Sequence, residues 1–163
     1  MITDNLLMLS GTTSATTGVT TGQDLSQVAA AYNSENIVDT GNATNIARDM
    51  GEGEPLYIVF TVTEAFTSGG AATVAINCVV SAATALTTPT TVGSIAATAV
   101  ASLTLGTQFV VRINPLVASL GLRYLGVIYT IATATTTAGA MSAYVVKDFQ
   151  DGKKFYKSGF ELV

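Results

Sequence analysis

The sequence contains no histidine and no tryptophan, and it has a single cysteine. Without histidine, the chain has no Ser-His-Asp or Cys-His catalytic pair and no imidazole to bind zinc. Cys78 has no partner for an intramolecular disulfide. It lies in phase with the apolar residues Val74, Ile76 and Val80, which favours a buried side chain over a reactive thiol. We therefore expect neither an enzyme nor a protein that holds a cofactor or a metal.

Charge is also scarce. Charged residues make up 11% of the chain, hydrophobic residues make up 48%, and the mean hydropathy is +0.48. A soluble domain usually contains about 25% charged residues. Between Ala65 and Val146 the only charged residues are Arg112 and Arg123. A chain of this composition is expected to cover its surface with copies of itself or with a partner protein.

Two classes of partner are not expected. The apolar stretches are interrupted every few residues by Thr, Ser, Asn or Gly, and none reaches the roughly 18 residues of a membrane-spanning helix. The net charge of −4 and the pI near 4.5 argue against a general nucleic-acid-binding protein. We therefore expect no contact with membranes or nucleic acids.

One cluster of carboxylates is present in the sequence, formed by Asp49, Glu52, Glu54 and Glu64. Calcium prefers several oxygen ligands from one loop, so a cation site is one interpretation. The other is a solvated turn, or ion pairs with Arg48 or with Arg123 of a neighbouring molecule. The spacing matches no calcium-binding loop, which favours the second interpretation.

The clearest strand follows Pro55. Its apolar residues alternate with a second set: Leu56, Ile58, Phe60 and Val62 against Tyr57, Val59, Thr61 and Thr63. A period of two places each set on one face of a strand, and the bulk on both faces predicts a central strand rather than an edge. Gly69 and Gly70 follow, and they predict a hairpin turn with positive φ angles.

Further strands are expected at 35–40, 71–81, 109–114, 123–132 and 139–147, where apolar and polar residues again alternate. The Ala- and Thr-rich segment 82–108 is ambiguous. Short strands near 92–95 and 100–105 are one interpretation, and a helix over 95–105 is the alternative. About eight short strands without a long helix predict an all-β fold, an antiparallel jelly-roll-like sandwich with N- and C-terminal arms.

The first 34 residues are expected to form an arm. Residues 11–22 predict a loop, and Asp24 to Tyr32 predicts a short helix, since Asp24 is a possible N-cap with Gln27 three residues later. The sandwich then occupies 35–150, and 151–163 form a tail of interleaved lysines and aromatic residues. Acidic neighbours offset these lysines, which favours docking on an adjacent subunit over nucleic-acid binding.

Several segments together resemble the small capsid cement (decoration) proteins of tailed bacteriophages. The longest is RDMGEGEPLYIVFTVTEAF at 48–66. The others, in the same order as in that family, are MITDNLL at the start, ENIVDTG at 35–41, RYLGVIYTIA at 123–132, TAG at 137–139 and QD at 150–151. The stretch 11–33 and the tail 152–163 depart from the family pattern.

This resemblance implies a trimeric jelly-roll-like protein on the outer surface of the capsid, where it bridges subunits of the major capsid protein. The residues that we expect at contacts between molecules are Ile2, Leu6, Leu7, Met8, Arg48, Arg112, Arg123, Phe155, Tyr156 and Phe160. Two alternatives from other classes remain at this point. One is a glycan-binding or adhesion module of jelly-roll type, and the other is a head-fibre or tail component.

Overall fold

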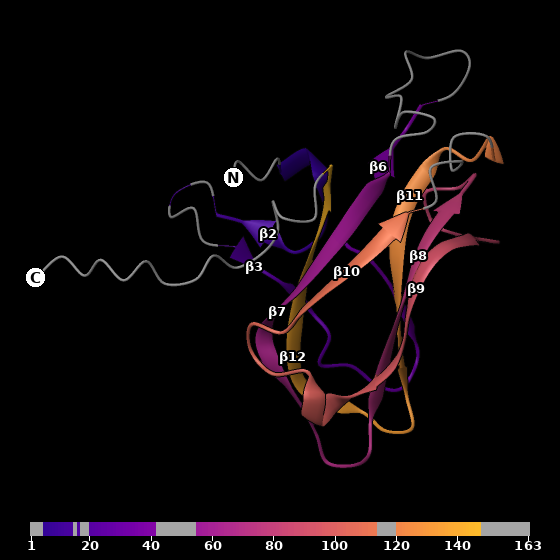
Figure 1. Cartoon of the computed structure of the whole chain (residues 1–163). Helices are drawn as coiled ribbons and strands as arrows, with labels where there is room; N and C mark the ends of the chain where they lie inside the picture. The colour runs from indigo at the N-terminus through magenta and orange to yellow at the C-terminus, as the bar shows by residue number, and fades with distance from the viewer. Residues whose placement is uncertain (1–4, 15, 17–19, 42–54, 114–119, 148–163) are drawn as a thin grey trace, which may run out of the picture.

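The computed structural model describes residues 5–14, 16, 20–41, 55–113 and 120–147. Within these residues the chain forms two packed antiparallel sheets, as Figure 1 shows. The first sheet has the order β1 (Met8–Ser10), β12 (Thr136–Val146), β7 (Leu56–Ser68) and β10 (Gln108–Ile113), with β4 (Gln23–Asp24) also paired to β12. The second has the order β5 (Ala31–Asn33), β11 (Tyr124–Ala132), β8 (Thr73–Ser81) and β9 (Thr90–Ala99), with β6 (Val38–Asp39) also paired to β11.

Three smaller pieces complete the described structure. The strands β2 (Thr12–Thr13) and β3 (Thr20–Thr21) pair with each other, and the 3-10 turns are η1 (Asn5–Leu7) and η2 (Val100–Ser102). The predicted all-β class is confirmed.

The order of the strands is that of a jelly roll. Because β1 and β4 pair with successive parts of β12, they are one interrupted strand, and β5 and β6 form another beside β11. Counted in this way, the sandwich has eight strands. In chain order, strands one, three, six and eight lie in the first sheet, and strands two, four, five and seven lie in the second. Strands that are distant in sequence are therefore neighbours in space, which is characteristic of two interleaved Greek keys.

The core lies between the two sheets. Strand β7 is central in its sheet, as predicted, and its Ile58, Phe60 and Val62 are buried. The predicted inward sets of β8 and β11 are also buried: Val74, Ile76, Cys78, Val80, Leu125, Val127, Tyr129 and Ile131. Apolar alternation thus predicted correctly which face of each strand is inside.

Tyr129 connects the two sheets. Its ring is fully buried and meets the ring of Phe60 edge-on, with centroids 6.4 Å apart and planes at 87°. Its hydroxyl donates a 2.8 Å hydrogen bond to Oγ of Ser10, a buried residue in β1. A buried tyrosine hydroxyl needs such a partner, because an unsatisfied polar group inside a protein is costly.

The turn predicted at Gly69 and Gly70 is present, but it is not a hairpin turn. The strands on either side of it, β7 and β8, belong to different sheets, and neither glycine has a positive φ. The segment therefore carries the chain from one layer of the sandwich to the other (Figure 1). The prediction was wrong because the identity of a strand's partner is not encoded in the turn alone.

Two predictions for ambiguous segments also need correction. The short helix expected from Asp24 to Tyr32 does not form, because Asp24 is in β4 and Tyr32 is in β5. In the second segment, one continuous strand, β9, replaces the shorter strand expected near 92–95. The turn η2 begins where a second strand was expected, and the alternative helix over 95–105 is absent.

The boundary predicted at residue 35, between an N-terminal arm and the sandwich, lies inside the sandwich. Strands β1, β4 and β5 all precede it and pair with β11 or β12. The stretch 11–22, expected to be a loop, contains the paired strands β2 and β3. The tail 151–163 lies outside the described residues.

Candidate interaction surface

Charged side chains occupy only a small part of the described surface. The described residues include four acidic and three basic side chains: Asp24, Glu35, Asp39, Glu64, Arg112, Arg123 and Lys147. A sheet that faces water usually presents polar and charged residues on its outer side. The positions of these seven residues therefore show which outer faces lack charge.

The outer face of the second sheet carries no charge over β5, β8, β9 and residues 128–132 of β11, and Asp39 of β6, opposite Tyr124, lies beyond this region. Its rows follow from the pairing of β5, β11, β8 and β9, in which Asn33, Ile128, Asn77 and Ser94 form one row across the sheet. We call the set Ala31, Asn33, Thr73, Ala75, Asn77, Ser94, Ile128, Thr130 and Ala132 the uncharged face. All of these side chains are exposed or half-buried, and most are small, so the face offers a flat surface without ionisable groups.

Another part of this outer face is covered by the chain itself. Leu86, in the loop between β8 and β9, is buried, and it lies over Gly126 of β11. A Cβ at Gly126 would come within 2.7 Å of the Leu86 Cδ1. Hydrogen bonds from Asn33 Nδ2 to the Ala85 carbonyl (3.0 Å) and from Ser81 Oγ to the Thr87 carbonyl (2.7 Å) fix the loop. The uncharged face lies outside the part that this loop covers.

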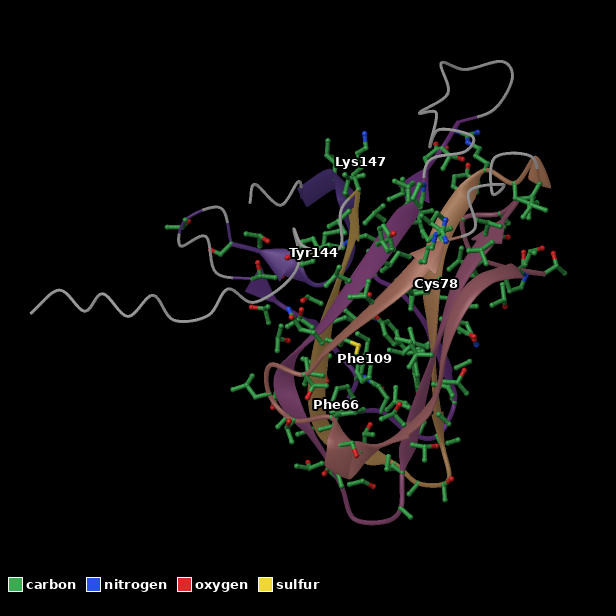
Figure 2. The ribbon with its side chains drawn as sticks, viewed as in Figure 1. Phe66, Cys78, Phe109, Tyr144 and Lys147 are labelled. Carbon is green, nitrogen blue, oxygen red and sulfur yellow. The ribbon has the colours of Figure 1, made fainter. Side chains whose placement is uncertain are left out.

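The outer face of the first sheet differs. Arg112 is exposed on β10 and lies opposite Tyr57 of β7. The insertion 11–22 covers part of this face, since a Cβ on Gly22 would come within 2.2 Å of Thr63 Oγ1. The Tyr144 hydroxyl donates a 3.2 Å hydrogen bond to Thr20 Oγ1, and Figure 2 shows this side chain near β2 and β3.

Polar contacts hold the base of the insertion. Glu35 Oε2 accepts a 3.2 Å hydrogen bond from the Gly11 N–H, and Asn36 Nδ2 donates one of 3.3 Å to the Gly11 carbonyl. The buried Gln23 side chain donates to the Asn33 carbonyl (2.8 Å) and accepts from the Glu35 N–H (3.1 Å). The insertion therefore leaves strand β1 and returns to β4 at one fixed point.

The single cysteine lies in the sandwich interior. Phe66, Cys78 and Phe109 lie between the sheets (Figure 2). Burial raises the pKa of the Cys78 thiol from its ordinary value of 9.0 to about 12, so the thiol stays protonated and inert near neutral pH. The prediction of a buried, unreactive cysteine agrees with this position.

The structure places the predicted contact residues in different environments. Leu6 is 66% exposed, whereas Leu7 packs against the core and Met8 is only 3% exposed. Met8 therefore belongs to the core of its own chain and offers no side chain to a neighbour. Arg112 is exposed. The remaining residues that we expected at contacts, Ile2, Arg48, Phe155, Tyr156 and Phe160, lie outside the described residues.

Arg123 forms an ion pair within its own chain. Its Nε and Nη2 each lie 2.7 Å from a carboxylate oxygen of Asp39, a bidentate arrangement. Its guanidinium also lies 5.1 Å from the centre of the Tyr124 ring. The hydrogen bond with Asp39 raises the pKa of Arg123. The pair ties β6 to the start of β11, and the contact with a neighbour that we expected of this arginine stays a prediction.

The carboxylate cluster cannot be assembled from the described part of the chain. Asp49, Glu52 and Glu54 lie outside it, and Glu64 is exposed on β7. No group of three possible metal ligands occurs among the residues that the structure describes. In the same residues, no helix is long and apolar enough to cross a membrane.

Sequence reasoning did not identify the uncharged face. The signal was present, because the outward positions of 73–77 and 128–132 are Thr, Ala, Asn and Ile where a solvated strand usually carries charge. The sequence does not show that these two strands are neighbours in the sheet. Their pairing, with Asn77 opposite Ile128, makes two uncharged strands into one surface.

Comparison with protein families finds a match. The model of the Bbp16 family matches residues 13–145, which includes every strand of the sandwich except β1 and the last residue of β12. No curated protein matches the chain.

Proposed function

The chain belongs to the Bbp16 family, which is phage-associated, and we propose that it is a structural virion protein that binds the outside of a phage capsid. In this proposal it bridges subunits of the major capsid protein and holds the shell against the pressure of the packaged DNA. It acts as a homotrimer, as the resemblance to capsid cement proteins implies. No catalysis and no cofactor are part of this function.

The observation that carries the proposal is the uncharged face. A monomer in water gains solubility from charged residues on its outer strands, and this face has none. Burial against another protein costs little here, because no charge has to be desolvated. The face suits a contact of large area without a deep pocket, and the same weak contact repeated over a shell gives strong total binding.

The test is binding to capsids that lack this protein. We expect the purified wild-type protein to co-sediment with such particles and to restore their resistance to heat and osmotic shock. The variant Ala75→Lys places a charge in the centre of the uncharged face, and we expect its affinity for the particles to fall by about tenfold or more, since a charge buried in an interface without a partner is costly.

The matched control is Val110→Lys, which adds the same charge to the outer face of the first sheet, where Val110 is 41% exposed. We expect it to bind like the wild type. Equal loss of binding in both variants would remove the role of the uncharged face. If the wild-type protein does not bind the particles, the proposed function itself is wrong.

A further inference from the structure

Among the described residues the sandwich has four sheet edges, and three of them are short or charged. The edge beside β12 is divided between β1, of three residues, and β4, of two. The edge beside β11 is divided between β5, of three residues, and β6, of two. The edge strand β10 has six residues and carries the exposed Arg112. Shortness, interruption and charge are the features by which natural sheets prevent edge-to-edge association.

Strand β9 is neither short nor charged, and its one protective feature is a pair of bulges. It runs for ten residues, from Thr90 to Ala99, and among the described residues it is hydrogen-bonded to β8 alone. Its sequence, TTVGSIAATA, contains no charge and no proline, and most of its residues are exposed. β10 approaches Gly93 of β9, since a Cβ on Gly93 would come within 2.5 Å of Val111 Cγ1 and 3.3 Å of the Arg112 carbonyl oxygen, but no ladder pairs the two strands. Within the described part of the chain, one row of its backbone N–H and C=O groups is therefore open to another strand.

The shape of β9 is symmetric about Ser94. The register with β8 is regular at Gly93, Ser94 and Ile95, which lie opposite Cys78, Asn77 and Ile76. The register shifts once on each side of this run. On β8, one shift lies between Cys78 and Val79 and the other between Val74 and Ile76. Each shift places one extra residue in β9 and bends the strand. Two antiparallel copies centred on Ser94 would therefore bend at matching positions.

We propose that β9 pairs with β9 of a second copy about a two-fold axis at Ser94, so that the second sheets of two molecules become one continuous sheet. A two-fold axis places each residue near its own counterpart, so a charged edge would repel itself, and an uncharged one does not. In this register Ser94 faces Ser94, Gly93 faces Ile95, and the outer faces of both sheets lie on the same side.

The β9 pairing itself does not depend on the proposed function, but its effect on the capsid rests on that function. The continuous sheet doubles the uncharged face that a pair of molecules presents to the shell. The pairing has two-fold symmetry and the proposed trimer has three-fold symmetry. If both occur, β9 connects one trimer to the next, which would extend the cementing contacts laterally over the capsid.

The first test is a cross-link. Residues directly opposite in an antiparallel pair have Cα atoms about 4.5–5.5 Å apart, within the range of a disulfide. We expect Ser94→Cys, treated with a mild oxidant, to form a disulfide-linked pair of chains at least about tenfold faster than Ala29→Cys, an exposed position remote from β9 in the sequence. The native Cys78 is buried and does not compete.

The second test is the mass of the purified protein in solution, measured by light scattering after size exclusion. We expect the wild type to contain an even number of chains. Ser94→Lys places two like charges opposite each other at the axis, so we expect its mass to be half that of the wild type, while Ala29→Lys keeps the wild-type mass. Circular dichroism checks that each variant is folded.

The outcomes separate the two proposals. A mass of three chains, with no cross-link at Ser94→Cys above that of Ala29→Cys, overturns the β9 pairing and leaves the trimer. A mass of two chains that Ser94→Lys reduces to one supports the pairing and removes the trimer. If Ser94→Cys cross-links to a shell subunit instead of to itself, the occupant of this edge is not a second copy, and the proposal is wrong. If Ser94→Lys does not fold, the cross-link decides.

Discussion

At the scale of single residues, Gly139 is a position with no room for a side chain. It lies within β12 at φ +137°, a conformation that L side chains rarely adopt, and a Cβ there would lie 2.3 Å from the ring of the buried Phe66. The phenyl ring therefore occupies the space that any side chain at 139 would need. Sequence alone marked this glycine only as the start of a strand.

We expect Gly139→Ala to lower the free energy of unfolding by about 2–5 kcal/mol, the sum of backbone strain and overpacking. Gly69→Ala is the matched control, since a Cβ there meets nothing within 4 Å and its φ is not positive. Its effect should stay within about 1 kcal/mol. Urea denaturation measures both, and equal effects would contradict the role of the Phe66 contact.

Cys78 makes the stability depend on alkaline pH. Its pKa is raised by burial from 9.0 to about 12, so above pH 9.0 the unfolded chain loses a proton that the folded chain keeps. The stability from this thiol is fully present below its unfolded pKa and is lost as the pH rises toward the folded pKa. Burial raises the pKa of the Tyr129 hydroxyl as well, and it acts in the same direction.

We expect the free energy of unfolding to fall above pH 9 with a contribution from Cys78 of about 1.4 kcal/mol per pH unit. Cys78→Ala should be less stable at neutral pH, because it leaves a small cavity, but its stability should fall less steeply between about pH 9 and about pH 10.5. Urea denaturation at a series of pH values compares the two slopes. Parallel slopes would mean that the thiol is accessible in the folded state.

At the scale of elements, the segment from Asp24 to Tyr32 shows how tertiary contacts override a local pattern. The Asp24 carboxylate accepts a 2.8 Å hydrogen bond from the Ser26 N–H, which is an Asx turn rather than a helix cap. Leu25 is fully buried, and its N–H donates to the Gly139 carbonyl at 2.8 Å. The Gln27 N–H donates to Thr136 Oγ1. Bonds to β12 thus replace those that a two-turn helix would have made.

The insertion 11–22 is the second finding at this scale. Gly11 and Gly22 meet at its base, where a Cβ on Gly11 would lie 3.1 Å from the Gly22 Cα. The two Cα atoms are thus near the 3.8 Å span of one peptide bond. The interrupted strand of β1 and β4 can therefore be closed without the residues between these glycines.

We expect a variant that lacks residues 12–21, with Gly11 joined to Gly22, to keep the sandwich and to change the free energy of unfolding by no more than about 1 kcal/mol, because shortening a loop alters the chain entropy only slightly. Far-ultraviolet circular dichroism and urea denaturation test this. An unfolded or aggregated variant would show that β2 and β3 are needed to hold β4 on β12.

At the scale of the whole molecule, the few charges of the described surface lie away from the uncharged face. The outer face of the first sheet carries Arg112, and the Asp39–Arg123 ion pair is at the end of β11. The uncharged face has neither. Contacts made through it depend on apolar and neutral polar groups, which salt screens little, whereas contacts between exposed charges weaken over a Debye length of about 10 Å at 0.1 M salt.

We therefore expect capsid binding by this protein to change by less than about threefold between about 0.05 M and about 0.5 M salt, a range over which charge-driven binding falls steeply. Co-sedimentation with capsids that lack the protein, at several salt concentrations, measures the affinity. A loss of tenfold or more at high salt would show that charged groups, rather than the uncharged face, carry the contact.

The sequence by itself determined the long strands β7, β8, β11 and β12, the buried side of β7 and β8, and how little charge the chain has, because alternation and composition are local properties of the chain. The tertiary structure alone decided that β7 and β8 separate into different sheets, that β1 and β4 pair with the last strand, and that the open β9 edge borders an uncharged face. Each of these depends on pairing between segments far apart in sequence, and a strand's own residues specify a buried face without specifying the neighbour beside it.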